Sequence, residues 1–180
     1  MLSLVGPYRP SRSSNKALNV LKTVIFLVAF WLVFLYIIPM GISILEIEVG
    51  IQRFPPLMRV APIGLLVFSL ISLWSALTLA VNGNGTPLPF DTASRFVTSG
   101  PFAFIRNPFM IATTGQGVSL GVALGSIPVI AYVAIMLIVW YFVIRPAEER
   151  DLEKRFGDRW RAYARAVRAA RPRLTPYRQR

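Results

Sequence analysis

The 180-residue sequence contains no cysteine and no histidine. Without cysteine the chain has no disulfide, no thiolate nucleophile and no sulfur to carry a lipid. Without histidine it lacks the commonest metal ligand and the side chain that most often moves protons near neutral pH. Any chemistry here must therefore proceed without a thiol or an imidazole, and we expect no metal site.

Charged residues are also scarce, at 16% of the chain, whereas 54% of residues are hydrophobic. Continuous apolar runs of about 18 or more residues are long enough for a helix to cross a bilayer. Residues 20–44 and 57–81 each suit one crossing, and residues 108–144 suit two because Gly and Pro interrupt them at 125–128. The sequence therefore predicts an all-α, multi-span transmembrane helical bundle of about four spans. We expect residues 1–180 to form a single membrane domain.

Positive charge dominates what little charge there is, with a net charge of +12. The cations gather in the first 22 residues, in the loop between the second and third spans, and from Arg145 onward. Because cytoplasmic flanks collect lysine and arginine, we predict a multi-pass protein with both termini cytoplasmic. The basic tail, residues 146–180, needs only anionic lipid headgroups as its partner, so we expect no nucleic acid.

The tail also carries apolar residues at helical spacing, and they line one face: Leu152, Phe156, Trp160, Tyr163 and Val167. Arginines occupy much of the remaining surface. This pattern predicts a C-terminal amphipathic helix lying at the membrane interface, with Gly157 as an interruption.

Two polar clusters bracket the last two predicted spans. The first is the segment 83–110, which sets Gly, Pro, Asp, Arg and Asn between long apolar runs. The second is Arg145, Glu148 and Glu149, whose spacing of i, i+3 and i+4 puts all three on one helix face. Because both clusters fall on the predicted cytoplasmic side, we favour one shared site over separate ion pairs that merely anchor helices.

Within the first cluster, Gly83 and Gly85 can admit a ligand close to the backbone, although an ordinary helix-ending turn also uses such glycines. Arg106 can hold a carboxylate by two parallel hydrogen bonds, or can simply mark the cytoplasmic side. Further along, three glycines at four-residue spacing predict close helix packing: Gly117, Gly121 and Gly125.

Three stretches, GNGTPLPFD, SGPFAFIRNPFM and EERDLEKRFGDRWRAY, together resemble membrane methyltransferases of the isoprenylcysteine carboxyl methyltransferase and phospholipid methyltransferase superfamily. The resemblance covers a methyltransferase-like core over residues 83–167. Two positions depart from the family pattern. Asn107 stands where many relatives have His, and Met110 stands where Tyr is usual.

The resemblance implies S-adenosylmethionine as cofactor and methyl transfer to a lipophilic acceptor drawn from the bilayer. A carboxylate acceptor suits a chain without histidine, because it is already ionised at neutral pH and needs no general base. The expected catalytic residues are Arg106, Arg145 and Glu149. The residues expected to bind the cofactor are Gly83, Gly85, Gly100, Pro101, Phe102, Arg106, Asn107, Pro108, Glu148 and Glu149.

Two alternatives stay open at this point. The acceptor can instead be the amine of a phospholipid or another small lipid, in which case the enzyme is an N-methyltransferase. The chain can also be a non-catalytic membrane scaffold or a transporter subunit that keeps the same shape.

Overall fold

The computed structural model describes residues 9–11, 15–88 and 91–178; Arg12 of the basic start and Pro89 and Phe90 of the first motif lie outside them. The described part contains helices and a single isolated bridge between Pro10 and Thr92, with no strand. The all-α prediction is therefore confirmed. In chain order the helices are α1 (Lys16–Trp31), η1 (Leu32–Ile37), α2 (Ile38–Val49), α3 (Ala61–Asn82), η3 (Gly100–Ala103), α4 (Pro108–Leu124), α5 (Ile127–Val139), η4 (Trp140–Ile144), α6 (Arg145–Phe156) and α7 (Asp158–Ala166).

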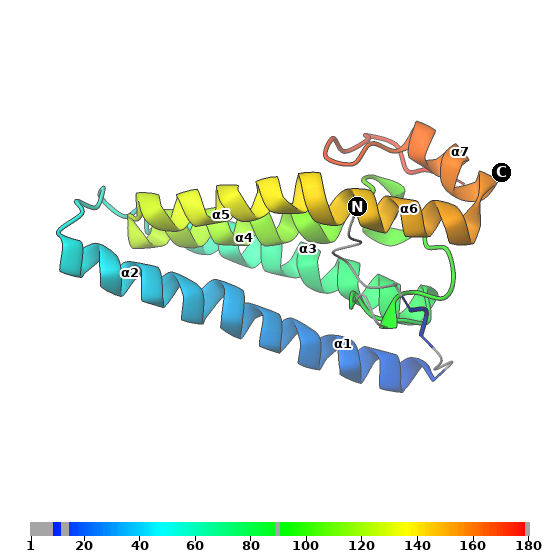
Figure 1. The fold of residues 1–180 in the computed structure, drawn as a ribbon, viewed down its shortest axis with the longest axis horizontal. Helices are drawn as coiled ribbons and strands as arrows, with labels where there is room; N and C mark the ends of the chain where they lie inside the picture. The colour runs from blue at the N-terminus through cyan, green and yellow to red at the C-terminus, as the bar shows by residue number, and fades with distance from the viewer. Residues whose placement is uncertain (1–8, 12–14, 89–90, 179–180) are drawn as a thin grey trace.

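In the described part of the chain, three helices are long and apolar enough to cross a membrane, which supports an integral membrane protein. Two of them are continuous rods built from consecutive elements. Lys16–Val49, with 34 residues, consists of α1, η1 and α2, and Ile127–Phe156, with 30 residues, consists of α5, η4 and α6. The third is α3, with 22 residues. The remaining predicted crossing is α4, a 17-residue helix that lies in the same bundle beside α3 and α5 (Figure 1).

Both long rods contain a π-helical turn that precedes a proline. Turn η1 ends just before Pro39, and η4 ends just before Pro146. A proline inside a helix lacks an N–H donor, and its ring clashes with the carbonyl four residues earlier. The wider π-helical turn gives that ring room, so each rod continues through its proline without a break.

Glycines let the central helix α4 approach its neighbours closely. A side chain added at Gly117 would come 2.6 Å from Val133, and one added at Gly121 would come 2.5 Å from Ile130, both on α5. On the α3 side, Gly115 faces the ring of Phe68 in the same way. The packing role predicted for Gly117 and Gly121 is confirmed. Gly125 instead ends α4 with φ +64° and lies against the carbonyl of Phe54 in the α2–α3 connection.

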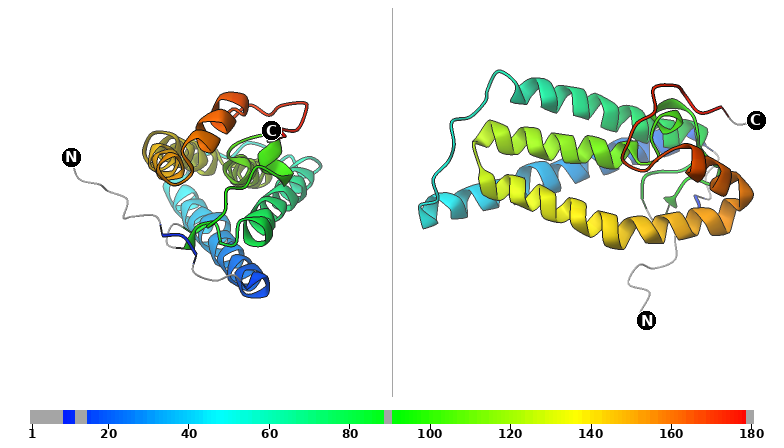
Figure 2. Two further views of the ribbon diagram at one scale, coloured as in Figure 1. Left: turned by 90° about the vertical axis from the view of Figure 1, so that its right-hand side faces the viewer. Right: turned by 90° about the horizontal axis from the view of Figure 1, so that it is seen from above.

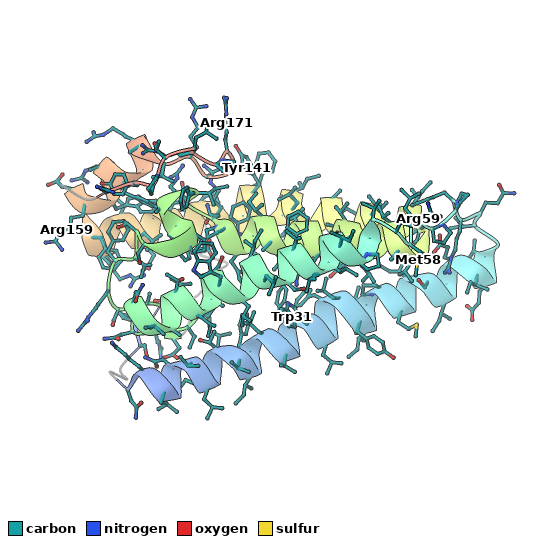
Figure 3. The ribbon with its side chains drawn as sticks, turned by 180° about the vertical axis from the view of Figure 1, so that it is seen from behind. Trp31, Met58, Arg59, Tyr141, Arg159 and Arg171 are labelled. Atoms are coloured by element: carbon teal, nitrogen blue, oxygen red, sulfur yellow. The ribbon has the colours of Figure 1, made fainter. Side chains whose placement is uncertain are left out.

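The bundle has two different ends (Figures 1 and 2). One end holds the α2–α3 connection and the tight α4–α5 turn. The other holds the start of α1, the long connection from α3 to α4, and helices α6 and α7 (Figure 2). Arg59 and Arg159 accordingly lie at opposite ends (Figure 3). Both predicted polar clusters therefore share one end of the molecule.

The amphipathic tail differs from its prediction in one respect. Gly157, with φ +52°, separates α6 from α7, as its position suggested. The apolar face, however, is buried inside the protein: Trp160, Tyr163 and Val167 form a core cluster to which Phe96 and Phe156 add. The α3–α4 connection packs against this apolar face, since the centre of the Phe96 ring lies 5.4 Å from that of Tyr163. This face is therefore covered by protein where we expected it to rest on the membrane surface.

Candidate functional site

A carboxylate held between two guanidinium groups marks the site at this end. Oε1 of Glu149 lies 3.1 Å from Nη1 of Arg106 and 3.0 Å from Nε of Arg145. Arg145 and Glu149 stand one turn apart at the start of α6, whereas Arg106 lies two residues before α4. All three side chains are at least three-quarters buried, with exposures of 13%, 19% and 24% for Arg106, Arg145 and Glu149. The structure thus brings the three predicted catalytic residues together.

Arg106 is fixed by contacts from the C-terminal part of the chain. Its backbone N–H donates to the carbonyl of Arg168 at 3.1 Å, and its guanidinium lies 5.6 Å from the centre of the Trp160 ring. Its Nε is buried and has no hydrogen-bond partner among the described residues. A buried guanidinium N–H without an acceptor is costly, so this atom is a ready donor for a bound carboxylate.

The other members of the second cluster have separate surroundings. Arg145 lies over the ring of Tyr141 at 4.6 Å, a cation–π contact that supports its position. Glu148 forms a side-chain hydrogen bond with Trp140, two turns earlier in the same rod. Its carboxylate does not line the cavity described next. Of the predicted glutamate pair, Glu149 is therefore the one placed to contact a ligand there.

A cavity of about 540 Å³ opens beside the Arg106–Glu149 pair. This volume falls within the range of about 300–1,000 Å³ that small-molecule sites occupy. Helices α6 and α7 supply its remaining walls, and the lining residues are Arg106, Pro146, Glu149, Arg150, Glu153, Trp160, Arg161, Ala164 and Arg165. A smaller apolar pocket of about 80 Å³ adjoins it through Arg106 and Trp160, and Phe102 lines this smaller pocket.

The predicted glycines occupy a different place. A side chain added at Gly85 would meet the backbone of Thr92 and Ala93 at 2.5 Å, and one added at Gly83 would meet the Ala93 side chain at 2.7 Å. Gly100, with φ +59°, packs on Thr78. Gly83 and Gly85 thus make room for the chain's own loop and Gly100 for α3, and none of the three lines either cavity. Pro101 and Pro108, both buried, and the half-buried Asn107, the residue before α4, also line neither cavity.

Sequence reasoning missed the contribution of α7 and the segment after it. The hydroxyl of Tyr163 donates to the carbonyl of Phe102 at 2.6 Å, and burial raises the pKa of this phenol, so it remains a donor. Beyond α7, the N–H groups of Arg173 and Tyr177 donate to Phe104 and Ala103 at 2.9 and 2.8 Å. The tail is thus an ordered strap over η3. The aromatic stripe was the available signal, but lipid exposure explained it equally well.

These features define an integral membrane protein with a polar cavity at one end of its helical bundle. The phospholipid methyltransferase family matches residues 58–159, more than half of the chain, and the chain belongs to this family. The match spans α3, the connection to α4, both hairpin helices, α6 and the start of α7. It includes Arg106, Arg145 and Glu149. The resemblance to the superfamily of integral membrane methyltransferases is confirmed.

One similar protein is the cobalt-zinc-cadmium resistance protein CzcN of Cupriavidus metallidurans, which is 29% identical over 124 residues. That similarity covers 69% of this chain and 53% of CzcN, so the chain spans about half the length of this relative. No solved structure matches the chain. Within residues 9–11, 15–88 and 91–178, no group of three or more His, Cys, Asp or Glu side chains is arranged to hold a metal ion.

Proposed function

We propose that this chain is an S-adenosylmethionine-dependent methyltransferase that acts on a lipophilic acceptor in the membrane. The observation that carries the proposal is the Arg106–Glu149–Arg145 cluster at the edge of the 540 Å³ cavity, within the region matched by the family. Its end of the bundle carries most of the cations, so we place it in the cytoplasm, where a soluble donor is available.

The residues present fit such a donor. S-adenosylmethionine would offer a carboxylate to the unpartnered Nε of Arg106 and an ammonium group to Glu149. The part of the Trp160 side chain that lines the cavity would offer an apolar contact to the adenine. When bound, the sulfonium supplies the methyl group, so the protein has to position the reactants and exclude water. Neither task needs a thiol or an imidazole.

A carboxylate is the acceptor we favour. One of its oxygens would form the new C–O bond while the C–S bond breaks and its electron pair passes to sulfur, so no proton has to move. The family description instead favours a phospholipid acceptor. If the methylated atom is an amine nitrogen, it attacks in its neutral form and a proton must be released. No histidine is available to accept that proton, which is why we rank N-methylation second.

Replacement of Glu149 tests the donor site. In Glu149→Gln the two guanidinium groups lose their shared carboxylate, so we expect the affinity for S-adenosylhomocysteine, measured by calorimetry on the detergent-solubilised protein, to fall at least about tenfold. The matched control is Glu48→Gln at the exposed far end of α2, which should bind as the wild type does. Equal affinity in all three proteins would remove Glu149 from the site. A wild-type protein that binds no donor product would favour the scaffold alternative.

The acceptor class is tested with membranes that contain the protein and a methyl-labelled donor. A methyl ester releases its label under mild base, whereas an N-methyl group keeps it. Base-labile lipid label would support carboxylate methylation, and base-stable lipid label would establish the phospholipid-type reaction in its place.

A further inference from the structure

The wall of the cavity carries more positive charge than the proposed donor requires. Four arginines and two glutamates line it. Glu149 is shared by Arg106 and Arg145, and Arg161 is paired with Glu153 at 3.2 Å and with Asp158 at 2.7 Å. Two lining arginines then remain without an ion-pair partner anywhere in the described chain: Arg150 and Arg165.

This excess is unfavourable for the donor alone. S-adenosylmethionine has a sulfonium, an ammonium and a carboxylate, so it carries net positive charge. Like charges in one cleft repel, and the repulsion grows as water is excluded from the cleft. Donor binding therefore leaves the charges of Arg150 and Arg165 compensated only by solvent and ions.

Arg150 and Arg165 are placed to bind an anion. Arg150 follows Glu149 on α6, and Arg165 lies in the last turn of α7, so the two guanidinium groups line the cavity from different helices. A guanidinium group binds carboxylate or phosphate through two parallel N–H donors. We propose that Arg150 and Arg165 recognise an anionic group, carboxylate or phosphate, on the lipid acceptor. This inference rests on the methyltransferase function proposed above.

The alternative is that both side chains are solvated cations of a basic tail. Arg159 is the comparison for this alternative. It belongs to α7, as Arg165 does, but it does not line the cavity and it extends away from the bundle (Figure 3). If general attraction to anionic lipid were responsible, Arg159 would contribute as much as Arg165 does.

The test uses the full chain in a nonionic detergent, saturated with S-adenosylhomocysteine. Two lipid pairs serve as probes: palmitate with methyl palmitate, and dioleoyl phosphatidate with dioleoylglycerol. We expect the wild type to bind at least one charged member about tenfold more tightly than its neutral partner. The double variant Arg150→Gln/Arg165→Gln should reduce that preference to about twofold or less, and Arg159→Gln should keep it.

The outcomes separate cleanly. Preference for palmitate alone identifies a carboxylate, and preference for phosphatidate alone identifies a headgroup phosphate. Equal binding of charged and neutral lipids by the wild type, or an equal loss in Arg159→Gln, would overturn the inference while donor binding keeps the proposed function. Failure of the wild type to bind S-adenosylhomocysteine would instead overturn the proposed function. If the double variant does not fold, the single variants, each at an exposed side chain, should each lose about threefold.

Discussion

Glu149 is the residue on which the candidate site depends. Its carboxylate accepts a hydrogen bond from Arg145 on α6 and forms an ion pair with Arg106, which lies before α4. A pair within one helix, such as Arg145 with Glu149, contributes only a few tenths of a kcal/mol, roughly 0.2–0.5, in isolation. The contact with Arg106 is long-range and largely buried, so it fixes where α6 lies relative to the α3–α4 connection.

Gly85 gives a prediction that separates a structural role from a ligand-binding role. In Gly85→Ala the new methyl group would lie 2.5 Å from the backbone of Thr92 and Ala93, so the loop must move. We expect a loss of about 1–3 kcal/mol in stability, measured as a lower thermal midpoint in detergent. The affinity of the folded protein for S-adenosylhomocysteine should stay within about twofold, because Gly85 lines neither cavity.

Gly41→Ala is the control, since nothing lies within 4 Å of the position a side chain would take there. It should not lower the midpoint. If Gly85→Ala melts normally but no longer binds S-adenosylhomocysteine, the sequence-based prediction that the ligand contacts the backbone at Gly85 would be supported instead.

Some individual residues of the candidate site could be predicted from the sequence and others could not. Arg106, Arg145 and Glu149 could be found because they flank spans on the same predicted side and because Arg145 and Glu149 share one helix face. Trp160 and Arg165 could not, because an aromatic residue or an arginine in a basic amphipathic stretch fits a lipid surface just as well. The glycines were ambiguous for a similar reason, since a tight turn and a ligand contact need the same absent side chain.

Among the elements, α7 contributes most to the site beyond the spans. It supplies Trp160 beside Arg106 and the Tyr163 hydroxyl that binds η3. It is only nine residues long, so it depends on packing for its helical structure. Its docking should therefore be sensitive to the aromatic cluster beneath it.

Trp160→Ala tests that dependence. Loss of a buried aromatic side chain costs about 3–5 kcal/mol, so we expect α7 and the following strap to lose protection in hydrogen exchange while α3 and α4 keep theirs. Affinity for S-adenosylhomocysteine should also fall, because Arg106 loses the ring beside it. Arg159→Ala, one residue away and exposed, should leave exchange unchanged. Full protection of α7 in Trp160→Ala would show that the cluster does not hold the helix.

The lengths and order of the elements could be predicted better than their continuity. Apolar runs gave the spans, and the break at Gly157 was correctly anticipated. The sequence could not show that Pro39 and Pro146 sit inside unbroken rods, because a π-helical turn has no residue pattern of its own.

At the scale of the whole molecule, both polar clusters lie at one end of the bundle (Figure 1). The distribution of cations predicts that this end faces the cytoplasm. The other end carries Arg53, which is paired with the buried Glu46 at 3.2 Å, and Arg59. One of its two cations is thereby neutralised, which strengthens the charge asymmetry between the ends.

Introduced cysteines test the orientation, since no native cysteine interferes. We expect Lys16→Cys and Thr175→Cys to react with a membrane-impermeant maleimide only after the cells are opened. Gln52→Cys, on the α2–α3 connection, should react in intact cells. All three positions are exposed in the structure, so burial does not limit labelling. Labelling of Gln52→Cys and Thr175→Cys from one side would contradict the arrangement of the ends.

The continuous rod Ile127–Phe156 has a consequence for the lipid environment. It carries Glu149 at one end and the hairpin turn at the other, whereas Arg106 belongs to the shorter α4. A helix longer than the local hydrocarbon layer accommodates a thinner bilayer by tilting. Any tilt of the rod that α4 does not share would change the 3.1 Å separation of Arg106 and Glu149. We therefore expect bilayer thickness to affect the geometry of the cavity.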